Sequence, residues 1–319
     1  MPLEYLHERY INPFTDFGFK RLFGTEMNKE LLIDFLNELL QGKNHIQTLR
    51  YQQNEHFAQT EFDRKAVFDL YCENQRGEKF IIELQKAKQN YFKDRTIYYS
   101  TFPIQEQAMK GEWDYRLNAV YTVGILDFVF DDVDRDQTVV NEVKLIDTGT
   151  HRIFYDKLTY IYLQMPNFDK SEDELESHFD RWLYVLKNLS ALTDRPAKLQ
   201  ERIFSRLFEA AEILKLTSEE RQAYEESLKH YRDLKNVIDT AREEGHQEGK
   251  EEGIGIGREE GIGIGREEGI SIGEKRGEQN MVQKIAREML SRGLSVEIIM
   301  EISGLSSEEI ANLQLTVSE

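Results

Sequence analysis

The sequence has little that would place it outside the cell or in a membrane. It contains one cysteine, Cys72, among 319 residues, which rules out a disulfide framework and fits a reducing compartment. No stretch approaches the ~18 consecutive apolar residues of a membrane-spanning helix. The opening segment MPLEYLHERY lacks the apolar core of a secretory signal. We therefore expect a cytoplasmic protein with no membrane partner.

Basic charge is also scarce. Lysine and arginine together number 41 against 59 aspartate and glutamate, which gives a formal net charge of -18. This balance argues against binding of nucleic acid through a broad basic surface. It leaves open an enzyme that reaches a polyanion through a bound metal ion and a local basic patch. With 39% hydrophobic residues the chain can build a core, so we expect folded domains.

Helical and extended patterns alternate in the first half of the chain. Apolar residues recur at helical spacing in residues 14–42, and residues 90–111 are typical of a long helix interrupted or kinked near Pro103. The continuous apolar run in 117–130 predicts a strand buried on both faces, and residues 152–168 predict one or two more. The sequence therefore predicts an α/β domain over residues 1–170.

The rest of the chain has the pattern of helices. Residues 171–242 predict a helical extension, and residues 280–319 predict a small three-helix module. The module resembles a helix-turn-helix, but its would-be recognition helix offers Glu308 and Glu309 and no basic residue. Because acidic side chains repel phosphate, we favour a packing or partner-binding role for it.

A glycine repeat occupies residues 243–279. The units KEEGIGIG, REEGIGIG and REEGISIG place glycine at every fourth residue from Gly245 to Gly277. Each glycine in a helix interior costs about 1 kcal/mol relative to alanine, so the repeat is a poor autonomous helix. Glycine at this spacing can nevertheless let two helices approach closely. Two alternatives stay open, an oligomerising helix and a flexible linker.

Residues 66–85 predict a β-hairpin that brings two acidic residues together. The turn is centred on Arg76, with Gly77 able to adopt a left-handed conformation. Pairing outward from Arg76 places Asp69 opposite Glu83, and the alternation of side chains puts Gln85 on the face of Glu83. The acidic residues lie next to the apolar run Phe80-Ile81-Ile82, so burial is expected.

Two facing carboxylates in apolar surroundings suggest a metal site. Facing carboxylates repel each other, and burying them costs several kcal/mol unless something neutralises them. Carboxylate oxygens suit Mg²⁺ or Mn²⁺, and Gln85 could orient a bound water or a phosphate. The alternative is that Asp69 and Glu83 lie on a solvated face of the hairpin.

The order of motifs resembles the PD-(D/E)xK nuclease superfamily, specifically its Rpn family of recombination-promoting nucleases, also labelled transposases. The likeness covers about residues 10–245 and is carried by FTDFGFKRLFG, DRKAVFDLYCEN, FIIELQ, DRTIYYST, YTVGILDF and YLQMPNF, the last with Gln164 and Asn167 in place of the usual Glu and Lys. The resemblance implies a restriction-endonuclease-like core, with a mixed central sheet flanked by helices, and a metal-dependent endodeoxyribonuclease. It implies that Asp69 and Glu83 are metal ligands and that Gln85 occupies the position of the superfamily's lysine.

Further residues are candidates for the same site. Asp63 and Lys65 precede the core and match positions of the family pattern, as the resemblance implies. Asp16 and Lys20 are four residues apart on one helix face, so they are either accessory site residues or a surface ion pair. Basic residues that follow Gln85 and could hold DNA phosphates are Lys86, Lys88, Lys93 and Arg95. The alternative for these four is a solvated charged face.

Taken together, the sequence predicts a Mg²⁺- or Mn²⁺-dependent DNA endonuclease that promotes recombination and forms homo-oligomers. The competing hypothesis is a catalytically weak or inactive DNA- or protein-binding module of the same fold, which assembles through the C-terminal repeat. Gln85 in place of a lysine is compatible with that alternative. The two differ in whether DNA binding is accompanied by metal-dependent cleavage.

Overall fold

The computed structural model describes residues 8–41, 45–52, 55–56, 66–108, 114–130 and 138–315. It divides the chain into two units, one ending at Asp239 and one beginning at Thr240. Each unit is described by itself.

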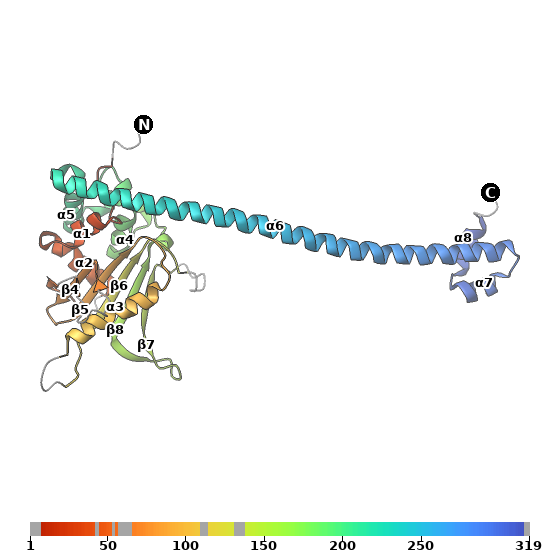
Figure 1. Ribbon diagram of the computed structural model, residues 1–319, viewed down its shortest axis with the longest axis horizontal. Coiled ribbons are helices and arrows are strands. Elements are labelled where there is room, and N and C mark those ends of the chain that lie inside the picture. Colours follow the sequence, from red (N-terminus) through yellow and green to blue (C-terminus); the bar gives the residue numbers. More distant parts are fainter. Residues whose placement is uncertain are drawn as a thin grey trace, which may run out of the picture. The chain divides into compact units, whose positions relative to one another are not determined.

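A mixed sheet of six strands forms the centre of the first unit (Figure 1), in the order β1-β4-β5-β6-β8-β7. The strands are β1 (Leu49–Tyr51), β4 (Leu70–Asn74), β5 (Lys79–Gln85), β6 (Val120–Leu126), β7 (Val140–Ile146) and β8 (Ile153–Gln164). Strands β5, β6 and β8 run parallel, and the other neighbouring pairs are antiparallel. A separate pair joins β2 (Glu55–His56) to β3 (Ala66–Val67).

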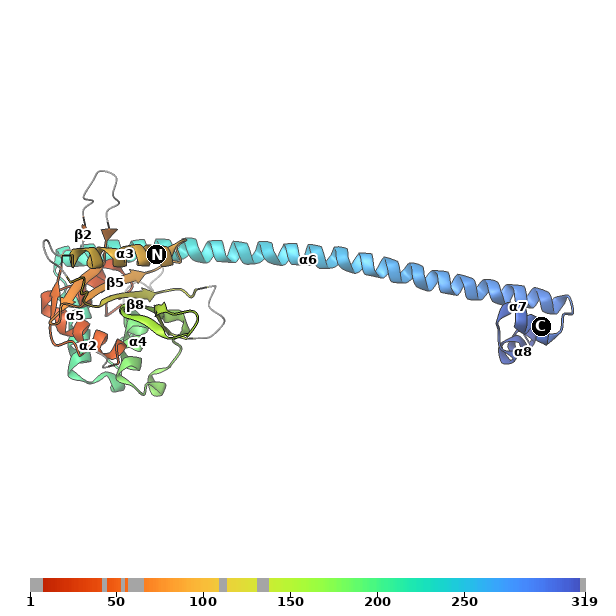
Figure 2. The same ribbon diagram turned by 90° about the horizontal axis from the view of Figure 1, so that it is seen from below.

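Helices cover both faces of this sheet (Figure 2), with α3 on one face and α2, α4 and α5 on the other. The helices of the first unit are α1 (Asp16–Phe23), α2 (Lys29–Leu39), α3 (Phe92–Glu106), α4 (His178–Asn188) and α5 (Arg202–Ala211). The large core cluster combines apolar side chains of β4, β5, β6 and β8 with those of α1, α2, α4 and α5. Trp182 of α4 is fully buried in it. The predicted α/β core is confirmed.

The hairpin of β4 and β5 has the register that the sequence predicts. Leu70 pairs with Ile82 and Cys72 pairs with Phe80. In the turn, Gly77 has φ +75°, and a Cβ there would lie 2.6 Å from the Asn118 side chain. Glycine therefore satisfies both the backbone conformation and the close contact.

Helix α3 packs on the sheet through hydroxyl groups. The Thr96 hydroxyl lies 2.7 Å from the Tyr162 hydroxyl, and the Ser100 hydroxyl lies 2.8 Å from that of Tyr160. The helix continues through Pro103 without interruption and ends at Glu106, earlier than predicted. These contacts fix the position of the basic residues that α3 carries.

Strand β7 was not predicted from the sequence. Its residues VNEVKLI are half-buried or exposed, because it is the edge strand of the sheet. An edge strand of this kind has no continuous apolar run to reveal it. The region 152–168 contributes one long strand, β8, followed by a short 3-10 helix.

Helix α6 (Ser218–Ser291) begins in the first unit, where its Tyr224 and Leu228 are buried. The Tyr231 hydroxyl donates a hydrogen bond of 3.0 Å to Asp127, at the end of β6. The glycine repeat belongs to the second unit and is helical throughout. None of the helices that the structure describes is long and apolar enough to cross a membrane.

The C-terminal module consists of the end of α6 with α7 (Val296–Ser303) and α8 (Ser307–Leu315). Ala286, Ile299, Ile310 and Leu313 form its small core. The first of the three predicted short helices is therefore the end of α6. At the start of α8, the Ser306 backbone N–H and hydroxyl donate to Glu309, and the Glu309 N–H donates to the Ser306 hydroxyl. These reciprocal hydrogen bonds form a capping box at the start of α8.

His178 joins three helical segments and should make stability depend on pH. Its Nε2 lies 2.7 Å from Asp34 and its Nδ1 lies 2.7 Å from Glu201, and the hydrogen bond to Asp34 raises the pKa of His178. The contribution of the protonated His178 to the free energy of unfolding is then fully present below about pH 6.5, the usual pKa of histidine. It is lost as the pH rises through the higher pKa that His178 has in the folded state. Asp34→Asn, whose side-chain oxygen can still accept from Trp182, should therefore lower the free energy of unfolding more at pH 5.5 than at pH 8.5. Urea titrations check this, and a pH-independent difference would contradict it.

Candidate metal and DNA site

Two carboxylates, Asp69 and Glu83, lie together at the end of the β4–β5 hairpin, and we call them the acidic pair. Continuing the strand register by one step places them opposite each other. The Asp69 N–H donates to Glu83 Oε1 at 3.4 Å, and the Leu84 N–H donates to Asp69 Oδ2 at 2.7 Å. Each carboxylate is therefore held by the backbone of the other strand. The solvated alternative is wrong for Glu83, which is only 4% exposed.

The surroundings of the acidic pair disfavour negative charge. Burial, followed by the neighbouring Asp69 carboxylate, raises the pKa of Glu83 to about 8. Burial also raises the pKa of Asp69, and the Leu84 N–H opposes that rise. An apolar, acidic position of this kind is stabilised when a cation binds to it.

Gln85 and Arg95 both act on Glu83. The Gln85 side chain hydrogen-bonds Glu83, and the positive charge of Arg95 lowers the pKa of Glu83. Arg95 comes from α3, where its guanidinium packs 5.2 Å from the centre of the Phe92 ring. Its Nε and Nη2 atoms are buried with no hydrogen-bond partner in the part of the chain that the structure describes. Buried donors without partners are costly, so these two atoms suit an anionic ligand.

Asp16, Lys20 and Lys86 lie on the Asp69 side of the site. Lys20 Nζ lies 3.1 Å from Asp16 Oδ1, so the predicted ion pair is present. The charge of Asp16 raises the pKa of Asp69, whereas Lys20 and Lys86 lower it. Lys86 is half-buried, and its burial lowers its own pKa. The surface ion pair of Asp16 and Lys20 is therefore present, and their role as accessory site residues stays a prediction.

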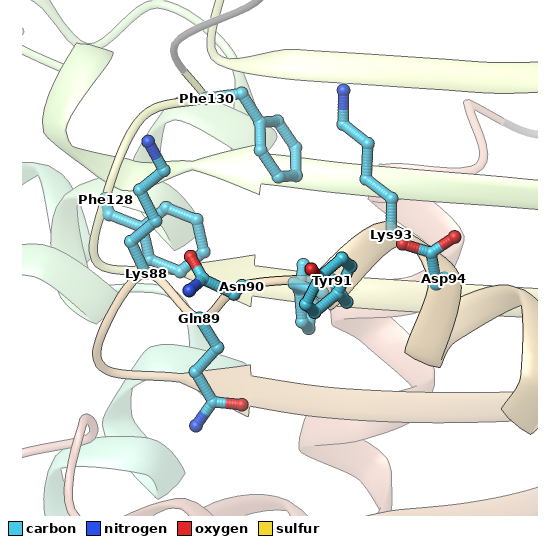
Figure 3. Close-up of a pocket in the computed structure, with 9 residues that line it drawn as sticks. Lys88, Gln89, Asn90, Tyr91, Lys93, Asp94, Phe128 and Phe130 are labelled. Carbon is cyan, nitrogen blue, oxygen red and sulfur yellow. The ribbon is translucent and has the colours of Figure 1, made fainter.

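The other two predicted DNA contacts, Lys88 and Lys93, line a hollow at the start of α3 (Figure 3). Lys88 is exposed in the loop after β5, and Lys93 Nζ lies 4.7 Å over the centre of the Phe130 ring. The four predicted basic residues thus lie around the carboxyl end of β5, in two groups. Lys86 is beside Asp69, while Lys88, Lys93 and Arg95 follow the loop and α3.

Two of the predicted site residues, Asp63 and Lys65, lie outside the described residues. Gln164, which stands in place of the usual Glu, is buried and accepts a hydrogen bond of 2.7 Å from the Phe130 N–H. Its amide therefore supports the loop after β6.

The donor set of the acidic pair fits Mg²⁺ or Mn²⁺. Among the described residues, no group of three or more histidine, cysteine, aspartate or glutamate side chains is placed to hold a metal ion. Mg²⁺ does not need such a cage, since it keeps several waters and is bound by one or two carboxylates together with substrate phosphates. Two facing carboxylates, one of them buried in an apolar sheet, satisfy that requirement.

A mixed six-stranded sheet flanked by helices, with an acidic pair on its central hairpin, defines a protein of the PD-(D/E)XK nuclease class. The chain belongs to the family described as PD-(D/E)XK nuclease family transposase, which matches residues 13–241. Residues 280–315 match the Rpn/YhgA-like nuclease family, C-terminal HTH domain. No curated protein and no solved structure matches the chain. Membership of this family implies a DNA nuclease, and the helix-turn-helix match implies DNA binding.

The sequence did not reveal which basic residues approach the carboxylates. Lys86 and Arg95 both influence the acidic pair, yet they are nine residues apart and reach it from different sides. The sequence signal for Arg95 was only its place in a basic run. The effect of its charge on Glu83 depends on the packing of α3 against the sheet.

Proposed function

We propose that the chain is a Mg²⁺-dependent DNA endonuclease that promotes recombination, with Mn²⁺ as an alternative ion. The observation that carries this proposal is the acidic pair, held face to face with Glu83 buried, in a chain of a nuclease family. Asp69 and Glu83 would hold the ion. When bound, such an ion lowers the pKa of a water and neutralises charge on a phosphate oxygen.

The chain's own residues supply binding and orientation. Gln85, held against Glu83, is placed to orient a water or the phosphate through its amide. Nε and Nη2 of Arg95, which have no hydrogen-bond partner among the described residues, suit a phosphate oxygen as their ligand. Lys86 places a positive charge on the Asp69 side and would hold the neighbouring DNA backbone.

Plasmid nicking tests the proposal. Wild type, Asp69→Ala and Glu83→Ala are compared with Mg²⁺ and with EDTA, and Glu142→Ala on β7 serves as an acidic control away from the site. We expect nicking by the wild type and the control with Mg²⁺ only, and none by the two site variants. Equal cleavage by all proteins would remove the acidic pair from the mechanism. DNA binding without cleavage by the wild type would support the inactive binding module instead.

We also propose that the glycine repeat mediates homo-oligomerisation. Six isoleucines, Ile254, Ile256, Ile262, Ile264, Ile270 and Ile272, are each more than half exposed along the helix. The glycines between them would leave room for a neighbouring helix, because a Cβ built at any of them meets nothing within 4 Å. Burying exposed isoleucines is the expected driving force for association.

Replacing three of these isoleucines tests the association. The triple variant Ile254→Gln, Ile262→Gln and Ile270→Gln should lower the molar mass measured by light scattering toward that of one chain. A triple Glu→Gln variant at Glu251, Glu259 and Glu267 keeps the isoleucines and should retain the wild-type mass. A wild-type chain that is monomeric at all concentrations would contradict the proposal.

A further inference from the structure

The aromatic hollow at the start of α3 is a second candidate binding site beside the acidic pair. It has a volume of about 290 Å³ and is formed by the loop after β5, the first turn of α3 and the loop after β6. Gln89 lines it and accepts a hydrogen bond of 2.5 Å from Arg95, whose charge acts on Glu83. The aromatic hollow is therefore linked to the acidic pair through Arg95.

The lining combines aromatic rings with cations. Phe128 and Phe130 stand edge to face with their centres 5.8 Å apart, and Lys93 lies over the Phe130 ring. Figure 3 shows Lys88 beside Phe128 at one end of the hollow, with Asp94 at the opposite end. Aromatic faces stack on nucleobases, and lysines hold the phosphates attached to them. The end with Lys88 and Phe128, away from Asp94, is where such a ligand fits.

Tyr91, the N-cap residue of α3, lies at the edge of the hollow with an exposed side chain. It is 80% exposed, and its backbone has φ +62°. This left-handed conformation is strained for a tyrosine. An exposed aromatic ring held in this way is available to stack on a ligand.

We propose that the aromatic hollow binds one extrahelical nucleotide of the DNA, stacking its base on Tyr91 and Phe128 beside the phosphate at the acidic pair. The inference rests on the proposed function and adds a substrate class, namely DNA with an unpaired nucleotide near the cut. A volume of about 290 Å³ suits a single nucleotide, since it is at the lower end for ligand pockets. A nucleotide that is already unpaired enters at the least cost, because no base pair has to be broken.

Binding measured in EDTA tests the inference independently of cleavage. Labelled duplexes that are fully paired or carry a one-nucleotide bulge are titrated with the full chain, and fluorescence anisotropy gives the affinities. Free dAMP is titrated as a competitor. We expect the wild type to prefer the bulged duplex by about 10-fold or more, from stacking of one base. Tyr91→Gly, which also removes the backbone strain, should lose most of this preference.

Tyr115 provides a matched control. It is 79% exposed with φ +59° and does not line the hollow, so Tyr115→Gly should keep the wild-type preference. Equal binding of both duplexes by the wild type, or equal loss in both tyrosine variants, would overturn the inference. Displacement of both duplexes alike by dAMP would identify a free-nucleotide site and also overturn it. A bulge preference in a chain that never nicks DNA would support this inference while refuting the proposed function.

Discussion

Glu83→Gln should reduce metal-dependent cleavage by about 100-fold or more while leaving the fold at least as stable as the wild type. The amide has the shape of the carboxylate but carries no charge to offset that of a divalent ion, so it binds the ion more weakly. Glu83 is buried with a raised pKa, so its ionisation opposes folding at pH values above the unfolded pKa of about 4.5. Removing the charge should therefore raise the unfolding temperature in EDTA, and by more at pH 8 than at pH 5.

Loss of cleavage without loss of stability would distinguish a functional role of Glu83 from a structural one. Nicking rates at saturating DNA and thermal unfolding in EDTA measure the two effects on the same protein. A variant that loses activity together with stability would show that Glu83 mainly supports the hairpin. A variant that keeps the wild-type rate would show that the carboxylate takes no part in cleavage.

Arg95→Lys should lower the cleavage rate by about 10- to 100-fold at saturating DNA, with a much smaller change in DNA affinity. Lysine keeps the positive charge but loses the planar fork that donates two hydrogen bonds to one phosphate. The substitution removes Nε and Nη2, the two donors that have no partner within the described part of the chain. Contacts that strengthen only as charge develops on the phosphate affect rate more than binding.

Arg116→Lys is the matched control for this prediction. Arg116 is exposed beside Asp114, and the same chemical change there should leave the rate unaltered. Because Arg95 also packs on Phe92 and Tyr99, the unfolding temperature is measured for each variant. An unchanged rate for Arg95→Lys would assign Arg95 to packing alone.

The sequence predicted the hairpin well because a tight turn determines its register. Once Gly77 was placed in the turn, the pairing of Asp69 with Glu83 followed from counting residues. The α/β core was predictable for a similar reason, since buried strands and helix stripes are local patterns. Both predictions needed only residues that are close in sequence.

The remaining features depend on contacts between distant segments. The effect of the Arg95 charge on Glu83 requires α3 to pack on the sheet, which no local pattern specifies. The exposed edge strand β7 lacks an apolar signal of its own. The aromatic hollow is formed by two loops about forty residues apart, Lys88 to Lys93 and Phe128 to Phe130, so only the fold brings them together.

The sequence also did not determine whether the glycine repeat is a helix or a flexible linker. Glycine penalises a helix, whereas the glutamates, arginines and isoleucines between the glycines favour or tolerate one. Propensity alone therefore left helix and linker equally supported. The structure continues α6 through the whole repeat to Ser291.

The central claim is that Asp69 and Glu83 together bind one divalent ion, and Mn²⁺ binding tests it most directly. Electron paramagnetic resonance of free Mn²⁺ is measured for wild type, Asp69→Asn and Glu83→Gln, each with a cleavage-resistant phosphorothioate duplex, and the signal for duplex alone is subtracted. The account predicts one Mn²⁺ site per chain in the wild type and at least about 10-fold weaker binding in each variant. Equal Mn²⁺ affinity in all three proteins would contradict it.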